Sequence, residues 1–307
     1  MSFTYVLRRV AQSIAALLAL MVVVFVLVRA TGSPVNLYLP LDAPQALRDE
    51  MTIKLGLDQP IYVQFWNWLV DAVQLDLGMS LWQGRPAIDV VLSALPNTLM
   101  LGLVVLTISS LLAILIGSLA AFRPNGHFDR FAGLVSLAGA SIPDFWLALM
   151  GILLFAVTLG WLPTSGSGDI RYWVLPVTVM VMRPLGTLVQ VVRGSMISAL
   201  AAPYVKTARA KGAPERRVIF VHALRNGLLP AITVAGDLAA QLAGGVTVVE
   251  VVFGWPGIGK LMIDAILNRD FAVLQAGILC VAAVIVTLNI LVDIAYAAID
   301  PRIQIQR

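Results

Sequence analysis

Long apolar runs separated by shorter polar segments form the main pattern along this chain. About 20 apolar residues in a helix, at ~1.5 Å rise per residue, cross the ~30 Å hydrocarbon core of a bilayer. We therefore expect membrane-spanning helices at residues 10–28, 98–122, 131–159, 173–192, 228–252 and 271–297. This pattern predicts an all-α membrane protein with six transmembrane helices.

The first apolar run follows Arg8 and Arg9 and at first sight resembles a signal peptide. Its apolar stretch is longer than a signal-peptide core, and no small-residue cleavage site ends it. We therefore expect residues 10–28 to be a retained transmembrane helix.

Composition supports the membrane class. Of 307 residues, 59% are hydrophobic and only 12% are charged, whereas soluble domains carry about 25% charged residues. So little polar surface argues against a soluble enzyme, a disordered protein and a nucleic-acid-binding domain. The lone cysteine, Cys280, lies in an apolar run, so it is expected to be a small buried hydrophobe, and no disulfide can form within the chain.

The basic residues gather in segments that six spans place on one side of the membrane. Arg123 and Arg130 lie between the second and third spans, and the segment 193–227 carries most of the other loop cations. The positive-inside rule makes this side cytoplasmic, together with both termini, residues 1–9 and 298–307. The net charge of +4 thus reports topology rather than a polyanionic partner.

The segment 29–97 is then the one long external loop. It is acidic and contains proline and glycine turn signals. Within it, residues 61–75 carry Phe65, Trp66 and Trp68, and we expect a short amphipathic helix at the membrane surface.

The cytoplasmic segment 193–227 contains a short predicted helix over Lys206 to Lys211, which Gly212 and then Ala213 and Pro214 end. Small side chains and exposed cations suit a helix that docks into a groove of another protein. A loop that only carries positive-inside charge explains this composition equally well.

Here the sequence resembles a family. The stretch YVKTARAKG, residues 204–212, is similar to the "EAA" loop of bacterial ABC importer permease subunits. Only Ala208 and Gly212 match the general Glu-Ala-Ala-x3-Gly pattern, but YxxTARAKG is typical of the dipeptide/oligopeptide/nickel branch. Further similar segments follow in order at residues 55–60, 76–80, 141–146, 160–166, 212–230 and 249–259.

The resemblance implies the type I ABC importer permease fold and a coupling helix that docks into a separate ATPase. Its residues would be Tyr204, Lys206, Thr207, Ala208, Arg209, Ala210, Lys211, Gly212 and Ala213. The implied partners are a homologous second permease, two ABC ATPases, an external substrate-binding protein and membrane lipid. The chain itself would be no enzyme and hold no cofactor, because ATP and Mg²⁺ would bind to the ATPases.

The segment from Gly254 to Lys260 nearly matches the phosphate-binding pattern GxxxxGK[ST]. Leu261 stands where that pattern needs a hydroxyl for Mg²⁺, so we reject a nucleotide site. A turn at the outer mouth is the better interpretation. Its candidate contacts with the binding protein are Gly254, Trp255, Pro256, Gly257 and Gly259.

Three ionisable residues, Asp144, Arg183 and Asp237, lie inside predicted spans. Each costs about 2.5–3.5 kcal/mol at a helix centre, so each should face protein or water. They could line a pore, or Asp144 and Arg183 could form an ion pair between helices, which we favour slightly. His127 and His222 are the only histidines, too few for a histidine-based metal site, and no metal site is expected.

These observations together predict a multi-pass permease subunit of the bacterial inner membrane that imports dipeptides or oligopeptides. A nickel or other small-solute importer of the same family is one alternative. An ion-coupled secondary transporter is another, with Asp144 and Asp237 as coupling carboxylates. A docking helix argues against it, because a self-sufficient carrier needs none. A scaffold without transport activity is the remotest alternative.

Overall fold

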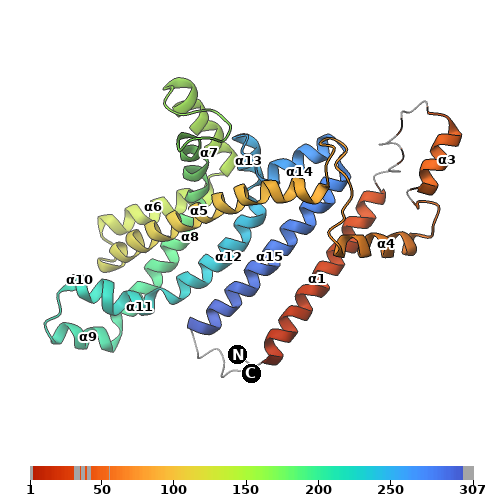
Figure 1. The fold of residues 1–307 in the computed structure, drawn as a ribbon. Helices are drawn as coiled ribbons and strands as arrows, with labels where there is room; N and C mark the ends of the chain where they lie inside the picture. The colour runs from red at the N-terminus through yellow and green to blue at the C-terminus, as the bar shows by residue number, and fades with distance from the viewer. Residues whose placement is uncertain (1–2, 31–34, 36–38, 40–42, 55, 300–307) are drawn as a thin grey trace. The chain divides into compact units, whose positions relative to one another are not determined.

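A computed structural model describes residues 3–30, 35, 39, 43–54 and 56–299, and these residues are mostly helical (Figure 1). The helices fall into two compact units. The first unit comprises residues 97–260 and 287–299, and the second comprises residues 3–96 and 261–286.

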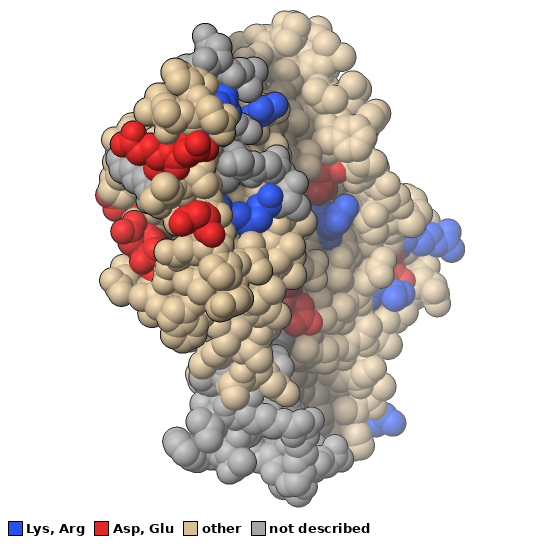
Figure 2. Space-filling view, turned by 90° about the vertical axis from the view of Figure 1, so that its right-hand side faces the viewer, with Lys and Arg blue, Asp and Glu red and all other residues tan. Residues whose placement is uncertain are grey.

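The second unit contains the long apolar helix α1 (Phe3–Ala30) and the first part of a second one, α15 (Phe271–Ile299). Its other elements are α3 (Gln45–Lys54), α4 (Ile61–Val73), the start of α5 (Ala87–Phe122) and most of α14 (Ile258–Leu267). The view from the side of α3 and α4 shows acidic side chains gathered on the nearest part of the surface (Figure 2). The external segment was predicted to be acidic, and exposed Asp49, Glu50 and Asp58 belong to this part of the chain.

The amphipathic helix predicted over residues 61–75 is present as α4. One face of α4 packs on α1, where the ring of Phe25 lies 5.3 Å from Phe65 and 5.6 Å from Trp68. The opposite face exposes Tyr62 and Trp66. Tyrosine and tryptophan side chains concentrate at the membrane–water interface, so exposed Tyr62 and Trp66 fit a helix at the membrane surface.

Asp270 fixes the start of α15. Its carboxylate accepts a hydrogen bond from Ser80 Oγ at 2.5 Å and one from the backbone N–H of Val273 at 3.3 Å. The first bond anchors the turn that follows α4, and the second caps the first turn of α15. Met79 and Pro86 pair in an isolated antiparallel bridge within this turn.

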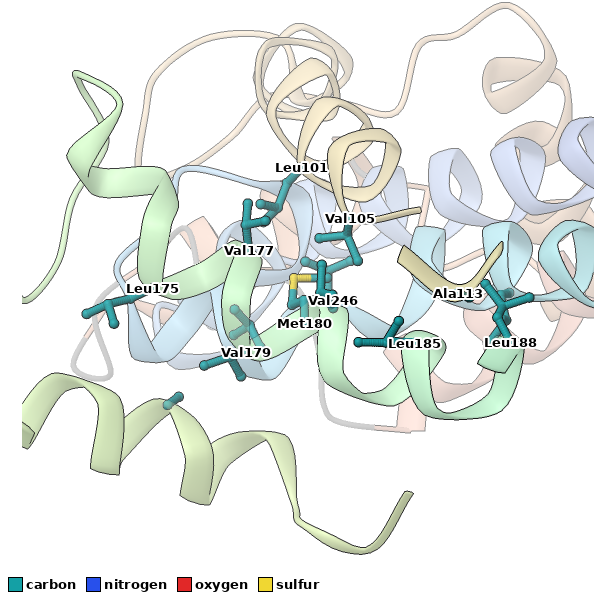
Figure 3. Close-up of a cluster of buried hydrophobic side chains, with 14 of the residues drawn as sticks. Leu101, Val105, Ala113, Leu175, Val177, Val179, Met180, Leu185, Leu188 and Val246 are labelled. Carbon is teal, nitrogen blue, oxygen red and sulfur yellow. The ribbon is translucent and has the colours of Figure 1, made fainter. Parts of the chain in front are cut away.

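The first unit is centred on α8 (Arg171–Ala201), which carries more of the core than its neighbours. The remaining elements here are α6 (His127–Ser141), α7 (Asp144–Gly151), η1 (Ile152–Thr158), α9 (Pro203–Ala210), α10 (Glu215–Arg217), η2 (Val218–Ala223), α11 (Leu224–Gly227), α12 (Leu229–Gly245) and α13 (Thr247–Val252). Figure 3 shows Met180 of α8 beside Val105 of α5 and Val246, with Val179 and Leu185 of α8 in the same buried cluster.

Helices α6 and α8 approach closely enough for backbone to touch backbone. A Cβ at Gly139 would overlap the carbonyl oxygen of Met182, and a Cβ at Gly186 would lie 2.7 Å from the carbonyl oxygen of Ser136. Small residues allow such contact between helices in lipid, where close packing drives association.

Within the described part of the chain, four helices are long and apolar enough to cross a membrane: Ala11–Arg29, Ala87–Phe122, Arg171–Ala201 and Phe271–Val292. Two bent pairs raise this number to 6 if each pair is one span. The first pair, His127–Ser141 with Asp144–Thr158, bends by 100°, and the second, Glu215–Gly227 with Leu229–Leu242, bends by 55°.

A proline accompanies each bend. Pro143 lies at the first break and Pro230 in the first turn of α12 after the second. Proline lacks the N–H that would continue the helix. Ile142, which precedes Pro143, lies outside the α region with ψ of 125°, as is usual before proline.

Candidate functional site

The helix predicted over residues 206–211 is present as α9. Pro203 occupies its first turn, and Gly212 follows its end with φ of +76°. The N–H of Gly212 donates to the carbonyl of Arg209 at 2.9 Å, and the N–H of Ala213 donates to that of Ala208 at 3.2 Å. A Cβ on Gly212 would meet nothing within 4 Å, so glycine is favoured here by its left-handed backbone and not by lack of space.

One side chain anchors α9 to the rest of the first unit. Val205 is fully buried in a cluster that includes Met196 of α8 and Val218 of η2. The surface of α9 away from this anchor exposes Tyr204, Lys206, Thr207, Arg209 and Ala210. Only Ala202, in an extended conformation, separates α9 from the end of α8.

Arg209 is already paired within the chain. Its guanidinium donates to both carboxylate oxygens of Glu215, at 2.9 and 3.1 Å. This hydrogen bonding raises the pKa of the Arg209 guanidinium above its ordinary value. Arg209 therefore holds the turn between α9 and α10 together, and exposed Lys206 and Lys211 add positive charge to the surface of α9 and its C-terminal end.

The structure brings together two of the three predicted intramembrane charges. Asp144 is the first residue of α7, and its carboxylate lies 3.9 Å from the guanidinium of Arg183 on α8. The ion pair between the helices is thereby confirmed, at long range. The second carboxylate oxygen of Asp144 is buried without a hydrogen-bond partner. Asp237, on α12, is exposed, and no described residue pairs with it.

A second ion pair, between Asp129 and Arg193, was not predicted. The guanidinium of Arg193 makes a two-point contact with Asp129, with the longer bond at 2.8 Å, and the N–H of Asn125 donates to the same carboxylate at 2.8 Å. Asp129 is nearly buried and Arg193 is one-third exposed. This pair ties the start of α6 to the last turns of α8, close to α9.

A buried glutamate organises the glycine-rich segment 254–259. The carboxylate of Glu250 is fully buried and accepts hydrogen bonds from Thr98 Oγ1 at 2.6 Å and from the N–H of Lys260 at 3.1 Å. Thr98 Oγ1 also accepts a bond from the N–H of Ile258 at 2.8 Å. A Cβ at Gly257 would overlap the carboxylate, so glycine is needed there for space.

Tryptophan and asparagine side chains close the same turn. The indole N–H of Trp255 donates to the carbonyl of Asn97 at 3.2 Å, while the amide of Asn97 donates to the carbonyl of Pro256 at 2.8 Å. The ring of Trp255 also lies 4.6 Å from that of Trp173, edge to face. The turn is therefore a rigid platform attached to α5 and α8.

Sequence reasoning did not select Glu250 as a functional residue, although a signal was present. An acid within the apolar run 228–252 is as costly as the three charges that were selected. Its partner Thr98 lies 152 residues away, and nothing in the pattern reports that proximity. Among the described residues there is no group of three or more His, Cys, Asp or Glu side chains that could hold a metal ion.

Comparison with known proteins gives a consistent result over the whole chain. The family described as "Binding-protein-dependent transport system inner membrane component" matches residues 113–305, and its N-terminal companion family matches residues 2–102. The oligopeptide transport system permease protein AppB of Bacillus subtilis is 38% identical over 98% of this chain and 99% of its own length.

Two other relatives are similar to the same extent. A putative peptide transport system permease protein of Brucella abortus is 35% identical over 97% of this chain and 98% of its own length. The glutathione transport system permease protein GsiC of Escherichia coli K12 is 36% identical over 98% of both. A crystal structure of an amino acid ABC transporter, at 14% identity, aligns with a TM-score of 0.54 over 68% of this chain and 94% of that one, which shows a shared fold.

Proposed function

This chain belongs to the family of binding-protein-dependent transport system inner membrane components, and from that premise we propose that it imports dipeptides or oligopeptides as the pore-forming subunit of an ATP-driven transporter. It is a multi-pass protein of the inner membrane. The observation that carries the choice of solute is full-length similarity to permeases named for oligopeptide, peptide and glutathione transport.

We propose six spans: the four long apolar helices, the bent pair His127–Ser141 with Asp144–Thr158, and the expected span over residues 228–252. The concentration of Lys and Arg between α8 and α12 supports a cytoplasmic location for α9 and both termini. The acidic segment before α5 and the platform at residues 254–259 then lie outside. The expected external substrate-binding protein would contact this platform at exposed Pro256 and half-buried Gly254, because Trp255, Gly257 and Gly259 are buried.

The exposed surface of α9 is the proposed docking surface for an ATPase subunit. Its small side chains permit close approach, and Lys206 and Lys211 supply positive charge for acidic partners. Because α9 adjoins α8 directly, closure of two ATPases would move α8 and, through Arg193 and Asp129, α6 as well. ATP and Mg²⁺ would be held by those ATPases.

The assembly we propose contains this chain, a homologous second permease, two ATPases and the binding protein. The pore would run between the two permeases, and Asp144, Arg183 and Asp237 remain candidates for its lining. Alternating access then requires that ATP binding favour one of two packings of the spans.

The test is peptide uptake by this complete assembly reconstituted in liposomes. Uptake should require ATP on the ATPase side and persist after the proton gradient is collapsed. Uptake that follows the proton gradient without ATP would instead identify a secondary transporter.

Gly212→Glu tests the docking surface separately. The variant should remain in the membrane but lose ATP-driven uptake, because it places a bulky anion beside the cationic helix. Gly212→Asn is the matched control, since asparagine tolerates the left-handed backbone better than most residues and adds no charge. Wild-type uptake by Gly212→Glu would contradict the assignment of α9.

A further inference from the structure

A cavity of about 180 Å³ lies within the second unit, where α1 ends and α15 begins. Residues of α1, α4, the turn before α5 and the first turns of α15 line it. The membrane-spanning stretches Ala11–Arg29 and Phe271–Val292 both have an end at this cavity. The cavity therefore lies at the level where hydrocarbon gives way to lipid headgroups and water.

Three polar side chains of this cavity make no hydrogen bond or ion pair with the described residues. The guanidinium of Arg29 lies 5.3 Å above the ring of Phe25, and no described acid pairs with it. The indole N–H of Trp68 is buried and makes no hydrogen bond within the described chain. Gln275 is 9% exposed, and its amide has no hydrogen-bond partner among the described residues.

The chemistry of these groups specifies the ligand class. Arginine and tryptophan side chains donate hydrogen bonds and cannot accept them, so the ligand must be rich in acceptors. A half-buried guanidinium without a carboxylate favours a negative charge, and its planar donors match a phosphate in two-point contact. The remaining wall is apolar and includes Leu77 and Phe271.

We propose that this cavity binds the headgroup phosphate of an anionic phospholipid. The phosphate accepts hydrogen bonds from Arg29 and Trp68, and Gln275 contacts the neighbouring glycerol or headgroup oxygens. The acyl chains run along α1, where exposed Val26 and Val22 lie one and two turns before Arg29 on the same face.

The surrounding structure supports lipid rather than a soluble anion. Helix α4 contributes Trp68 to the cavity and exposes Tyr62 and Trp66 on its other side. Aromatic side chains of this kind concentrate at the headgroup level of bilayers. In the proposed topology the bound lipid belongs to the outer leaflet.

The experiment measures lipid binding by the purified transporter in nanodiscs of phosphatidylcholine titrated with phosphatidylglycerol. Native mass spectrometry then measures how much phosphatidylglycerol stays bound after delipidation, and this fraction reports the affinity of the protein for that lipid. Arg29→Gln should weaken phosphatidylglycerol binding about fivefold, since one basic residue at an anionic lipid surface contributes ~1 kcal/mol. Trp68→Phe should weaken it too, because it removes the N–H and keeps the ring.

Matched controls lie in the same unit. Trp66→Phe changes the exposed tryptophan of the same helix, and Arg85→Gln removes an exposed arginine outside the cavity; neither should alter binding. If Arg29→Gln does not fold, Arg29→Lys and Trp68→Phe still test the site, and Arg29→Lys should retain most of the affinity.

Several outcomes would overturn the proposal. Unchanged phosphatidylglycerol affinity in both cavity variants would show that this cavity is not the lipid-binding site. Competition by inorganic phosphate at millimolar concentration would identify a free-anion site instead. If a second copy of this chain or the partner permease occupied the cavity in place of lipid, the cavity would be part of a subunit interface.

Discussion

Glu250→Gln perturbs the outer platform with almost no change of volume. In the structure one carboxylate oxygen accepts from Thr98 and the other from the N–H of Lys260. A glutamine offers one acceptor oxygen and one NH₂ group. With the amide oxygen toward Thr98, the NH₂ group faces the N–H of Lys260, donor against donor; with the amide turned, the NH₂ group can donate to Thr98 Oγ1, but the Thr98 hydroxyl loses the bond that it now donates.

The magnitude follows from burial and charge. Glu250 is fully buried, and a hydrogen bond to a charged group contributes about 1.5–3 kcal/mol, while an unpaired buried donor costs ~1–3 kcal/mol. Removing a buried charge partly offsets this loss, because the carboxylate no longer has to be desolvated. We expect a net destabilisation of about 2 kcal/mol, which corresponds to a thermal midpoint lower by about 4–8 °C.

The assay is tryptophan fluorescence during thermal unfolding of the purified protein, together with uptake driven by the binding protein. Glu215→Gln is the control, since Glu215 is exposed and its ion pair with Arg209 should contribute at most ~1 kcal/mol. Uptake by Glu250→Gln should fall at temperatures where the protein is still folded, because the platform loses its fixed shape.

The double variant Glu250→Gln with Thr98→Val tests whether these two side chains act in one network. Thr98 donates to Glu250 and accepts from Ile258, so the two substitutions remove parts of one network and should be less than additive. A Glu250→Gln midpoint equal to that of the wild type, or full additivity with Thr98→Val, would refute this account of the platform.

Two further predictions concern the first unit. Gly139→Ala should lower the free energy of unfolding by about 1–3 kcal/mol, because its Cβ meets backbone of α8. Gly133→Ala on the same helix has open space around it and should raise the free energy of unfolding by up to ~1 kcal/mol. Equal shifts in thermal midpoint would contradict this packing. Asp129→Ala and Arg193→Ala should each destabilise the fold, and the double variant should show a coupling energy of about 1–3 kcal/mol in the same measurement; simple additivity would show that the two groups do not act as a pair.

The sequence predicted the all-α fold class and the C-terminal end of α9, because both depend on local signals. Apolar run length indicates a span, and a glycine after a short polar helix indicates its end. The ranges 131–159 and 228–252 were expected as single spans. The first contains the break between α6 and α7, and the second contains Val246 between α12 and α13. Pro143 signals one break, but proline alone does not say whether a helix kinks or ends.

The hydrogen-bonded and ionic pairs between distant helices could not be predicted from these local signals. Glu250 and Thr98 are 152 residues apart, and Asp129 and Arg193 are 64 apart. Hydropathy patterns place residues on helices but do not say which faces of distant helices meet. Asp144 and Arg183 could be paired in advance because each is a single opposite charge on neighbouring predicted spans.

The arginines of α8 have a consequence for how the protein is made. Arg183 and Arg193 each cost about 2.5–3.5 kcal/mol near the centre of an isolated inserting helix, less toward its ends. Of the four long apolar helices, α8 has the lowest mean hydropathy and the largest buried share. The acids that pair with these arginines, Asp144 and Asp129, stand on α7 and α6, which leave the ribosome first. We therefore expect α8 to enter the bilayer poorly alone and readily beside α6 and α7, so that biogenesis depends on a newly inserted helical hairpin.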